Sequence, residues 1–268
     1  AAMATIGVLR PGAMGAAVGA ALAQAGHEVL WVAAGRSAAT ASRARAAGLT
    51  DAGSLDALLR SSAVVLSICP PDAAASVAEA AAGFDGIYVD ANAISPQRAA
   101  EIAHLVGPAY VDGGIVGPPP QRPGTTRLYL SGDPGPARAV AALFDGTALE
   151  ARVLDGHGAT AASALKMAYA AWTKGSAALL LAAERAAAAL GVHDALHEEW
   201  ARSQPELEAR LAAAGASAAA KGWRWVGEMR EIAATFEAAG QPGGFHRAAA
   251  DVFAAFPRPA GDEPVPAS

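Results

Sequence analysis

The sequence predicts an N-terminal α/β domain with a doubly wound parallel sheet, followed by an all-α C-terminal domain. Short apolar runs alternate with helical stretches as far as about residue 154. This β-α-β-α order is typical of a parallel sheet with helices on both faces. Beyond residue 158 the chain reads almost entirely as helix. We therefore expect domains over residues 1–157 and 158–256, with a flexible tail over 257–268.

The elements of the first domain follow from these runs. Apolar runs predict strands over 4–9, 28–32, 63–68, 86–90, 109–112, 127–130 and 148–154. The stretches between them predict helices over 13–25, 37–47, 72–81, 96–106 and 134–144.

The second domain begins with a proline-free helix over about 159–190. At 1.5 Å per residue it is roughly 45 Å long, which suits a long interdomain helix that also packs against a partner subunit. Further helices are expected over 193–203, 205–214, 217–239 and 245–256, because Gly191, Gly215 and Gly240 stand where helix-ending glycines belong.

Composition and charge exclude several classes of protein. The chain has 268 residues, of which 53% are hydrophobic and 17% charged, as expected for a folded globular protein. A net charge of −5 without a basic run argues against nucleic-acid binding. No apolar segment has the length of a membrane span, and the N-terminus does not read as a signal peptide. The single cysteine fits a reducing compartment, so we expect a cytoplasmic protein.

A glycine loop follows the first strand. The fingerprint for dinucleotides is G-x-G-x-x-G, and here Arg10 stands at its first position, Gly12 at its second and Gly15 at its third. Gly12 would let the backbone of Pro11, Gly12 and Ala13 approach a pyrophosphate at the positive end of the following helix. Gly15 would let that helix lie close to the strand, with Met14 packed beneath the loop. The loop favours a Rossmann domain, and an ordinary turn between strand and helix is the alternative.

The end of the second strand indicates which dinucleotide would bind. Domains specific for NAD place an acidic residue there, whereas Glu28 stands at the beginning of this strand. Arg36 has the planar fork that pairs with a 2′-phosphate, and Ser37 can donate to the phosphate while capping the next helix. Arg43 lies two turns further on and could assist. We therefore expect NADP(H); the alternative is a solvated Arg36 and a Ser37 that only caps the helix.

Five stretches carry a family resemblance: residues 9–15, 26–29, 90–96, 163–167 and 228–233. On these the chain resembles the β-hydroxyacid dehydrogenase superfamily, which includes 6-phosphogluconate dehydrogenase, 3-hydroxyisobutyrate dehydrogenases and imine reductases. The nearest likeness is to a branch of 6-phosphogluconate-dehydrogenase-like NAD(P)-dependent oxidoreductases. The resemblance covers nearly the whole chain. It implies hydride transfer and a homodimer formed through the C-terminal helices.

The resemblance also implies roles for individual residues. Cys69, Pro70 and Pro71 would lie along the cofactor, and Asn92 would touch the nicotinamide ribose. Lys166 matches the catalytic lysine of the family.

Two positions depart from the family pattern. Val116, followed by Gly117, replaces a serine that holds the substrate, and Ala170 replaces an asparagine, with Tyr169 beside it. Both changes remove polar contacts to a small hydroxy acid. They put standard 3-hydroxy-acid chemistry in doubt and suggest a different or bulkier substrate.

Helical spacing places four polar side chains on one stripe of the long helix. Ser163, Lys166, Tyr169 and Thr173 follow one another at intervals of three to four residues. A substrate pocket would supply the partners that such a stripe needs. The alternative is that Lys166 reaches the surface and Tyr169 belongs to the core.

These observations predict an oxidoreductase that uses NADP(H) on a small carbonyl/alcohol pair. Lys166 would be the general acid/base, with Tyr169 and Asn92 as further catalytic candidates. Substrate contacts are expected at Val116, Gly117, Ser163 and Thr173, and no cluster has metal-ligand spacing. An imine reductase and a non-catalytic nucleotide-binding protein are the alternatives.

Overall fold

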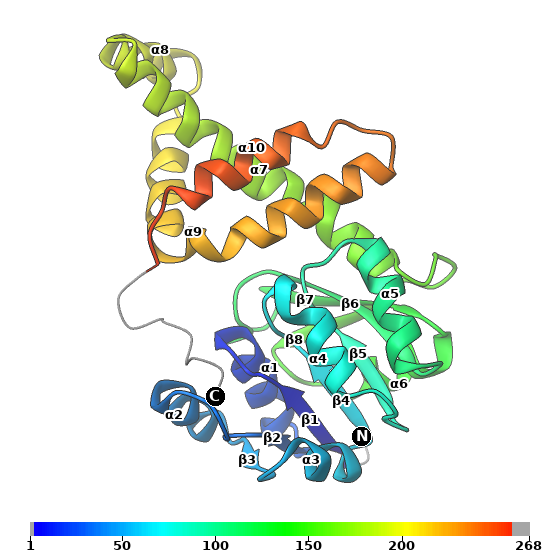
Figure 1. The fold of residues 1–268 in the computed structure, drawn as a ribbon. Coiled ribbons are helices and arrows are strands. Elements are labelled where there is room, and N and C mark those ends of the chain that lie inside the picture. Colours follow the sequence, from blue (N-terminus) through cyan, green and yellow to red (C-terminus); the bar gives the residue numbers. More distant parts are fainter. Residues whose placement is uncertain (1–2, 259–268) are drawn as a thin grey trace. The chain divides into compact units, whose positions relative to one another are not determined.

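The computed structural model describes residues 3–258 (Figure 1). These fall into two compact units, 3–166 and 167–258. Residues 259–268 of the expected tail lie outside the described part of the chain.

The first unit is built on an eight-stranded sheet. Its spatial order is β3-β2-β1-β4-β5-β6-β7-β8, and all neighbours are parallel except β6 and β7, which are antiparallel. The strands are β1 Thr5–Leu9, β2 Glu28–Trp31, β3 Thr50–Asp51, β4 Val64–Ser67, β5 Ile87–Asp90, β6 Tyr110–Val116, β7 Thr126–Gly132 and β8 Leu149–Val153.

Helices cover both faces of this sheet, so the predicted fold class is confirmed. The helices are α1 Ala13–Gln24, α2 Ala38–Ala46, α3 Leu55–Ser61, α4 Ala74–Ala80, α5 Pro96–Val106 and α6 Pro134–Ala142, with a short 3-10 turn, η1, over Pro71–Ala73. One core contains Val18 of α1 and Val140 of α6, and the other contains Leu58 of α3 and Ile102 of α5. The central strands are mainly apolar because both faces are covered, and their polar residues include Ser67 of β4, Asp90 of β5 and Asp112 of β6.

Two elements of the first unit escaped the sequence prediction, the short strand β3 and the helix α3. Residues 50–61 contain no continuous apolar run, and Leu58 is the buried residue of α3. Helix α3 lies close to β1 because Gly7 has no side chain: a Cβ there would come within 2.4 Å of the Leu58 side chain.

The second unit is helical and contains most of α7 Ala161–Ala189, together with α8 His193–Ser203, α9 Leu207–Ala238 and α10 Gly244–Ala254. Gly191 and Gly240 adopt positive φ angles of 73° and 72° just after α7 and α9, as expected of helix-ending glycines. The predicted break at Gly215 is wrong, because α9 runs through it. A glycine inside a helix costs only about 1 kcal/mol, which the packing of a 32-residue helix readily offsets. No helix in the described residues is both long and apolar enough to span a membrane.

Candidate active site

The loop between β1 and α1 keeps the turn of a dinucleotide loop although it lacks the first glycine. Arg10 adopts a φ of +52°, in the left-handed region that favours glycine. Gly12 is the N-cap of α1 and offers no side chain to the first-turn amides. A Cβ at Gly12 would meet nothing within 4 Å, and Gly12 and Ala13 are exposed. The amides at this helix start therefore face open space, as an anion-binding terminus requires.

The other loop residues pack inward. Pro11 is buried, and Met14 packs against the core as expected. Gly15 is less constrained than we expected. A Cβ there would lie 3.4 Å from Pro11 and 3.6 Å from Ile68, which is ordinary contact.

Two arginines come close together beside this loop. Arg36 follows β2, and its pKa is lowered first by partial burial and then by the nearby charge of Arg10. Two guanidinium groups that repel each other favour an anion between them. Ser37 caps α2, since its hydroxyl accepts from the backbone amide of Thr40 at 3.2 Å.

One row of paired residues joins the carboxyl ends of β1, β4 and β5 to Asp112, which lies within β6. Leu9 of β1 pairs with Ser67 of β4, Ser67 pairs with Asp90 of β5, and Asp90 pairs with Asp112 of β6. The polar members of this row are completely buried. The residues just after them, on the same edge, are the ones predicted to touch cofactor and substrate.

Asn92 ties two of these strand ends together. Its side-chain amide donates to the Ser67 hydroxyl at 3.0 Å, and its carbonyl oxygen accepts from the Cys69 amide at 2.6 Å. Its own backbone amide donates to Asp90 at 3.0 Å. Asn92 is 2% exposed, so the structure gives it a positioning role at the loop that contains Cys69.

Cys69 carries an inert thiol. Burial raises its pKa to about 11, so it is a neutral thiol near pH 7. Pro70 is exposed, and Pro71, the first residue of η1, is half-buried. This loop can line a ligand with apolar groups and does not supply a nucleophile.

Asp112 anchors the first turn of α7 to the sheet. Its carboxylate accepts from the Ser163 hydroxyl at 2.5 Å and from the Ser163 amide at 2.7 Å. Ser131 of β7 donates to the same carboxylate at 3.2 Å and accepts from the Ala162 amide at 2.9 Å. Ser163, which we expected at the substrate, is fully buried, and its hydroxyl is engaged by Asp112.

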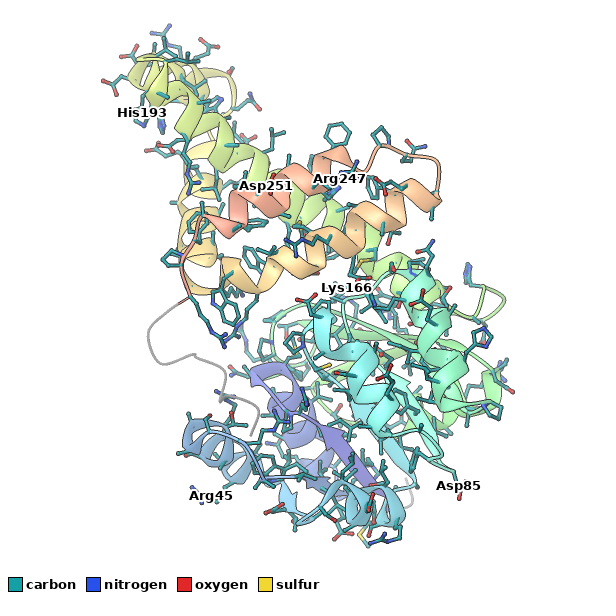
Figure 2. All side chains as sticks on the ribbon, viewed as in Figure 1. Arg45, Asp85, Lys166, His193, Arg247 and Asp251 are labelled. Carbon is teal, nitrogen blue, oxygen red and sulfur yellow. The ribbon has the colours of Figure 1, made fainter. Side chains whose placement is uncertain are left out.

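The hydrogen bonds from Ser163 to Asp112 fix the start of α7 on the sheet, and Lys166 follows three residues later in the same helix. A Cβ at Gly114 of β6 would lie 3.1 Å from the Cβ of Lys166 and 2.7 Å from the carbonyl oxygen of Ala162. The glycine therefore lets the first turn of α7 lie directly on β6. Lys166 is half-buried at this contact and is the last residue of the first unit (Figure 2).

Asp90 and Asp112 are buried carboxyl groups with raised pKa values. Burial raises the pKa of Asp90 to about 7, helped by the charge of Asp112. Burial raises the pKa of Asp112 to about 6, against the opposing hydrogen bonds from Ser163 and Ser131. The pair therefore titrates near neutral pH, within the frame that holds the strand ends.

The two residues expected near the substrate after β6 offer no polar side chain. Val116 is 3% exposed and pairs with Arg127 of β7. Gly117 adopts a φ of +117°, and a Cβ there would come within 2.3 Å of the Thr125 carbonyl oxygen. Gly117 is thus required by the turn between these strands.

Farther along α7, Tyr169 and Thr173 belong to the second unit. Tyr169 is 48% exposed, which excludes it from the core of that unit. The Thr173 hydroxyl is exposed and donates to the Tyr169 carbonyl at 3.3 Å. Both side chains are accessible on their own unit.

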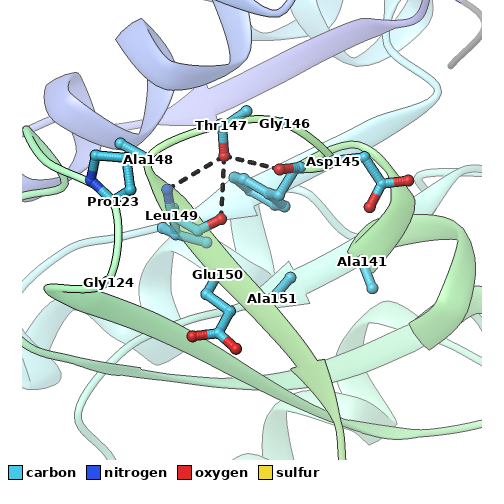
Figure 3. Close-up of a pocket in the computed structure, with 11 residues that line it drawn as sticks. Pro123, Gly124, Ala141, Asp145, Gly146, Thr147, Ala148, Leu149, Glu150 and Ala151 are labelled. Carbon is cyan, nitrogen blue, oxygen red and sulfur yellow. Dashed lines mark hydrogen bonds between the residues drawn. The ribbon is translucent and has the colours of Figure 1, made fainter.

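A pocket of about 320 Å³ lies elsewhere in the first unit, at the edge strand β8. It is lined by the turn before β8, by the start of that strand and by Pro123 and Gly124 (Figure 3). The Thr147 hydroxyl closes its turn by donating to the carbonyl oxygens of Phe144 and Leu149. The strands β4 to β7 separate β8 from β1, so this pocket is not part of the glycine-loop site.

Sequence reasoning missed three contributors to this arrangement. Arg10 was read only as a missing glycine, although its charge acts on Arg36. Asp90 at the end of β5 and Asp112 within β6 are buried carboxyl groups, a pattern that could have indicated a site because uncompensated burial of a carboxyl group is costly.

No curated protein sequence matches this chain. The family model described as "Domain of unknown function (DUF1932)" matches residues 187–256, from the end of α7 to just beyond α10.

Solved structures match over nearly the full length. One is the conserved protein MTH1747 of unknown function, which is structurally similar to 3-hydroxyacid dehydrogenases: identity 27%, coverage 93% of this chain and 95% of that chain, TM-score 0.66. Another is a 3-hydroxyisobutyrate dehydrogenase from Mycobacterium tuberculosis: identity 20%, coverage 95% and 94%, TM-score 0.70. A third is a reductive aminase from Aspergillus terreus in complex with NADPH: identity 19%, coverage 91% and 90%, TM-score 0.59. An imine reductase from Pseudomonas sp. also matches.

The chain has the fold of the hydroxyacid dehydrogenases and imine reductases. Its structural neighbours are 3-hydroxyisobutyrate dehydrogenases, imine reductases and related proteins, as the sequence resemblance predicts.

Proposed function

We propose that the chain is an NADP(H)-dependent oxidoreductase that transfers a hydride between nicotinamide and a small carbonyl/alcohol substrate. Lys166 acts as the general acid/base in this proposal. The structural neighbours of the chain include dehydrogenases and reductases, one of them in complex with NADPH, and this supports the reaction class.

One observation carries the proposal: the order of groups along the carboxyl edge of the sheet. Four residues follow consecutive strands: Arg36 after β2, Gly12 after β1, Cys69 after β4 and Asn92 after β5. The fifth, Lys166 of α7, packs against Gly114 of the next strand, β6. These strands are consecutive in the sheet. At about 4.8 Å per strand, the row spans roughly 19 Å from β2 to β6. Dinucleotides bind across this edge at the point where the strand order reverses, here between β1 and β4.

The residues present fit such a ligand. The open amides at Gly12 and Ala13 suit a pyrophosphate, since no side chain caps them. The charges of Arg36 and Arg10, which act on each other, suit a further phosphate, and Ser37 can add a hydroxyl beside its capping role. The loops at Cys69 and Asn92 would line the nicotinamide half, which supplies or accepts the hydride when bound.

Lys166 supplies the proton chemistry. As an ammonium ion it donates a proton to the substrate oxygen during reduction and takes it back during oxidation. Its place on β6 is set by Gly114 and by the bond between Asp112 and Ser163. In this proposal Val116 and Gly117 bound the substrate without polar groups. Tyr169 as a further catalytic residue and Thr173 as a substrate contact stay predictions from their helical spacing to Lys166.

Imine reduction is the second candidate function. The last residue of β6 is the buried Val116, which has no hydroxyl, so no polar side chain at this strand end selects a hydroxy acid. A cyclic imine needs a proton donor and an apolar surround, which Lys166 and this strand end can provide. A nucleotide-binding protein without turnover is the remaining alternative.

We also propose a homodimer formed through the helical unit. Large apolar side chains are strongly exposed on α7 and α10, among them Trp172 and Leu179 at 71% and Phe245 at 73%. Exposed apolar side chains of this size commonly belong to subunit interfaces.

The test combines a substrate panel with a Lys166 variant. NADPH oxidation would be followed with ketones, 3-oxo acids and cyclic imines. With the best substrate, Lys166→Ala should lower kcat by about 10²–10⁴-fold, the usual size of a general-acid effect, and leave NADPH affinity nearly unchanged. A Lys166→Arg variant controls for charge, since arginine does not give up its proton.

Unchanged turnover in Lys166→Ala would remove Lys166 from the mechanism. Tight NADPH binding with no turnover of any panel member would favour the non-catalytic reading. The preferred member of the panel separates the carbonyl from the imine hypothesis.

A further inference from the structure

A second cluster of reactive side chains lies in the helical unit, where α7 ends and α8 begins. Glu184 is in the last turns of α7, and His193 and His197 are in the first turns of α8. One ligand atom from each of the three residues lies within 4.8 Å of the other two. Figure 2 shows His193 at the start of α8. The proposed oxidoreductase activity does not use this cluster.

The fold brings the three residues together in two steps. His193 and His197 are four residues apart on one helix, so both rings project from the same face. Their ring centroids are 4.3 Å apart. The chain then reverses at Gly191, whose φ of 73° ends α7, and this reversal returns α8 to Glu184. Sequence spacing alone did not reveal the cluster, because Glu184 joins it only through that turn.

His193 is oriented as a ligand. Its Nδ1 lies 3.0 Å from an Asp194 carboxylate oxygen, which favours a proton on Nδ1. Its Nε2 then presents a lone pair to the Glu184 oxygen 3.2 Å away. Two acceptors at this distance need a cation between them, either a proton or a metal ion. A carboxylate bonded to the far nitrogen of a ligating histidine is the common support of zinc sites.

His197 provides an independent indication. Its Nε2 is buried and has no hydrogen-bond partner in the described residues. A buried polar nitrogen without a partner is costly in a folded protein, and a bound metal ion or a water molecule would satisfy it. The ring is held in place by stacking on His193 and by a tilted contact with Trp200 at 5.4 Å.

We propose that Glu184, His193 and His197 form a binding site for a divalent transition-metal ion of the zinc type. Two imidazoles and one carboxylate are the ligand set that zinc accepts, with water in the fourth position. Ligand atoms around a tetrahedral zinc ion are roughly 3.4 Å apart, given bond lengths of about 2.0–2.1 Å. The pair formed by Glu184 and His193 already has this spacing. The ion would fasten the end of α7 to α8.

The experiment uses the full chain without an affinity tag, freed of metal with a chelator and titrated with zinc chloride by calorimetry. We expect one zinc ion per chain. The variants Glu184→Gln, His193→Ala and His197→Ala should each weaken binding by roughly tenfold or more, comparable with or larger than the loss caused by outer-shell changes. Zinc should also raise the thermal midpoint of the wild type through mass action, and less so in the variants.

A matched control is His104→Ala, which removes an exposed histidine from α5 in the other unit. It should leave zinc binding unchanged, and far-ultraviolet circular dichroism should show that every variant is folded. The proposal is overturned if the wild type does not bind zinc, since a proton then suffices between His193 and Glu184. It is equally overturned if folded variants bind zinc as the wild type does.

Discussion

Arg10 shows how one residue can depart from a motif and still adopt the backbone turn of that motif. At this position a glycine would normally supply the positive φ, yet Arg10 adopts +52° itself. Holding a non-glycine residue there costs on the order of 1 kcal/mol or more. Its guanidinium group lies close enough to Arg36 to lower the pKa of that residue. A strained arginine beside a second arginine is more consistent with anion binding than with a simple turn.

This pair leads to a prediction about cofactor choice. Arg36→Ala and Arg10→Ala should each weaken NADPH binding by roughly tenfold or more, because a charge-assisted bond contributes about 1.5–3 kcal/mol. NADH binding should change little, since NADH lacks the 2′-phosphate. Fluorescence titration with both cofactors measures the two affinities.

The matched control for this prediction is Arg45→Ala, an exposed arginine in the last turn of α2. It should leave both affinities unchanged. Equal losses for NADPH and NADH in the Arg36 or Arg10 variant would contradict the assignment of these residues to the 2′-phosphate.

At the scale of the element, the helices of the second unit show where glycine patterns mislead. Gly191 and Gly215 look alike in sequence, yet only Gly191 has a positive φ and follows the end of a helix. The difference is set by packing around α9, which a reading of local composition does not contain. Helix propensity is a weak guide of about 1 kcal/mol, and tertiary contacts override it.

Because α9 is continuous through Gly215, we predict that alanine at this position stabilises the folded protein. Gly215→Ala should raise the free energy of unfolding by about 0.5–1 kcal/mol, because alanine has less freedom to lose in a helix. There is room for the methyl group, since Leu181 at 4.0 Å is its nearest neighbour. Urea denaturation monitored by circular dichroism measures the change.

The comparison variant is Gly175→Ala in α7, where the new Cβ would lie 2.8 Å from the His246 ring. It should destabilise the protein, in contrast to Gly215→Ala. A loss of stability in Gly215→Ala as well would mean that α9 is not continuous through that position.

At the scale of the whole molecule, much of the fold follows from the sequence. The alternation of apolar runs with helices predicts the sheet class, and the helix predicted over 96–106 has the bounds of α5, Pro96–Val106. The opposite direction of β7 could not be derived, since direction depends on long-range pairing. The site was predicted as separate motifs. The hydrogen bonds that hold these motifs in place, from Ser163 to Asp112 and from Cys69 to Asn92, join residues far apart in the chain.

The buried carboxyl pair predicts how stability varies with pH. The pKa of Asp90 in the folded protein is about 7, against an ordinary value near 3.9. Between these values the folded state holds a proton that the unfolded chain releases, so the free energy of unfolding falls as pH rises from about 4 to 7. The contribution is fully present below this window and lost above it. Asp112 acts in the same direction, with a pKa of about 6.

Asp90→Asn should flatten this decline, because the amide cannot ionise. Denaturation curves from pH 4 to 8 give the slope for each protein. The control is Asp85→Asn, an exposed residue after α4 (Figure 2) that should leave the slope as in the wild type. An identical slope in Asp90→Asn and wild type would show that Asp90 stays ionised in the folded protein.

Gly114 has a consequence for which substitutions the chain can accept during evolution. The start of α7 rests on the main chain of β6, so a single methyl group at Gly114 would push against the backbone of that helix. Position 114 therefore admits glycine alone, whereas side chains that do not support α7 are free to vary. If Lys166 is the proton donor that we propose, its placement depends on this one glycine.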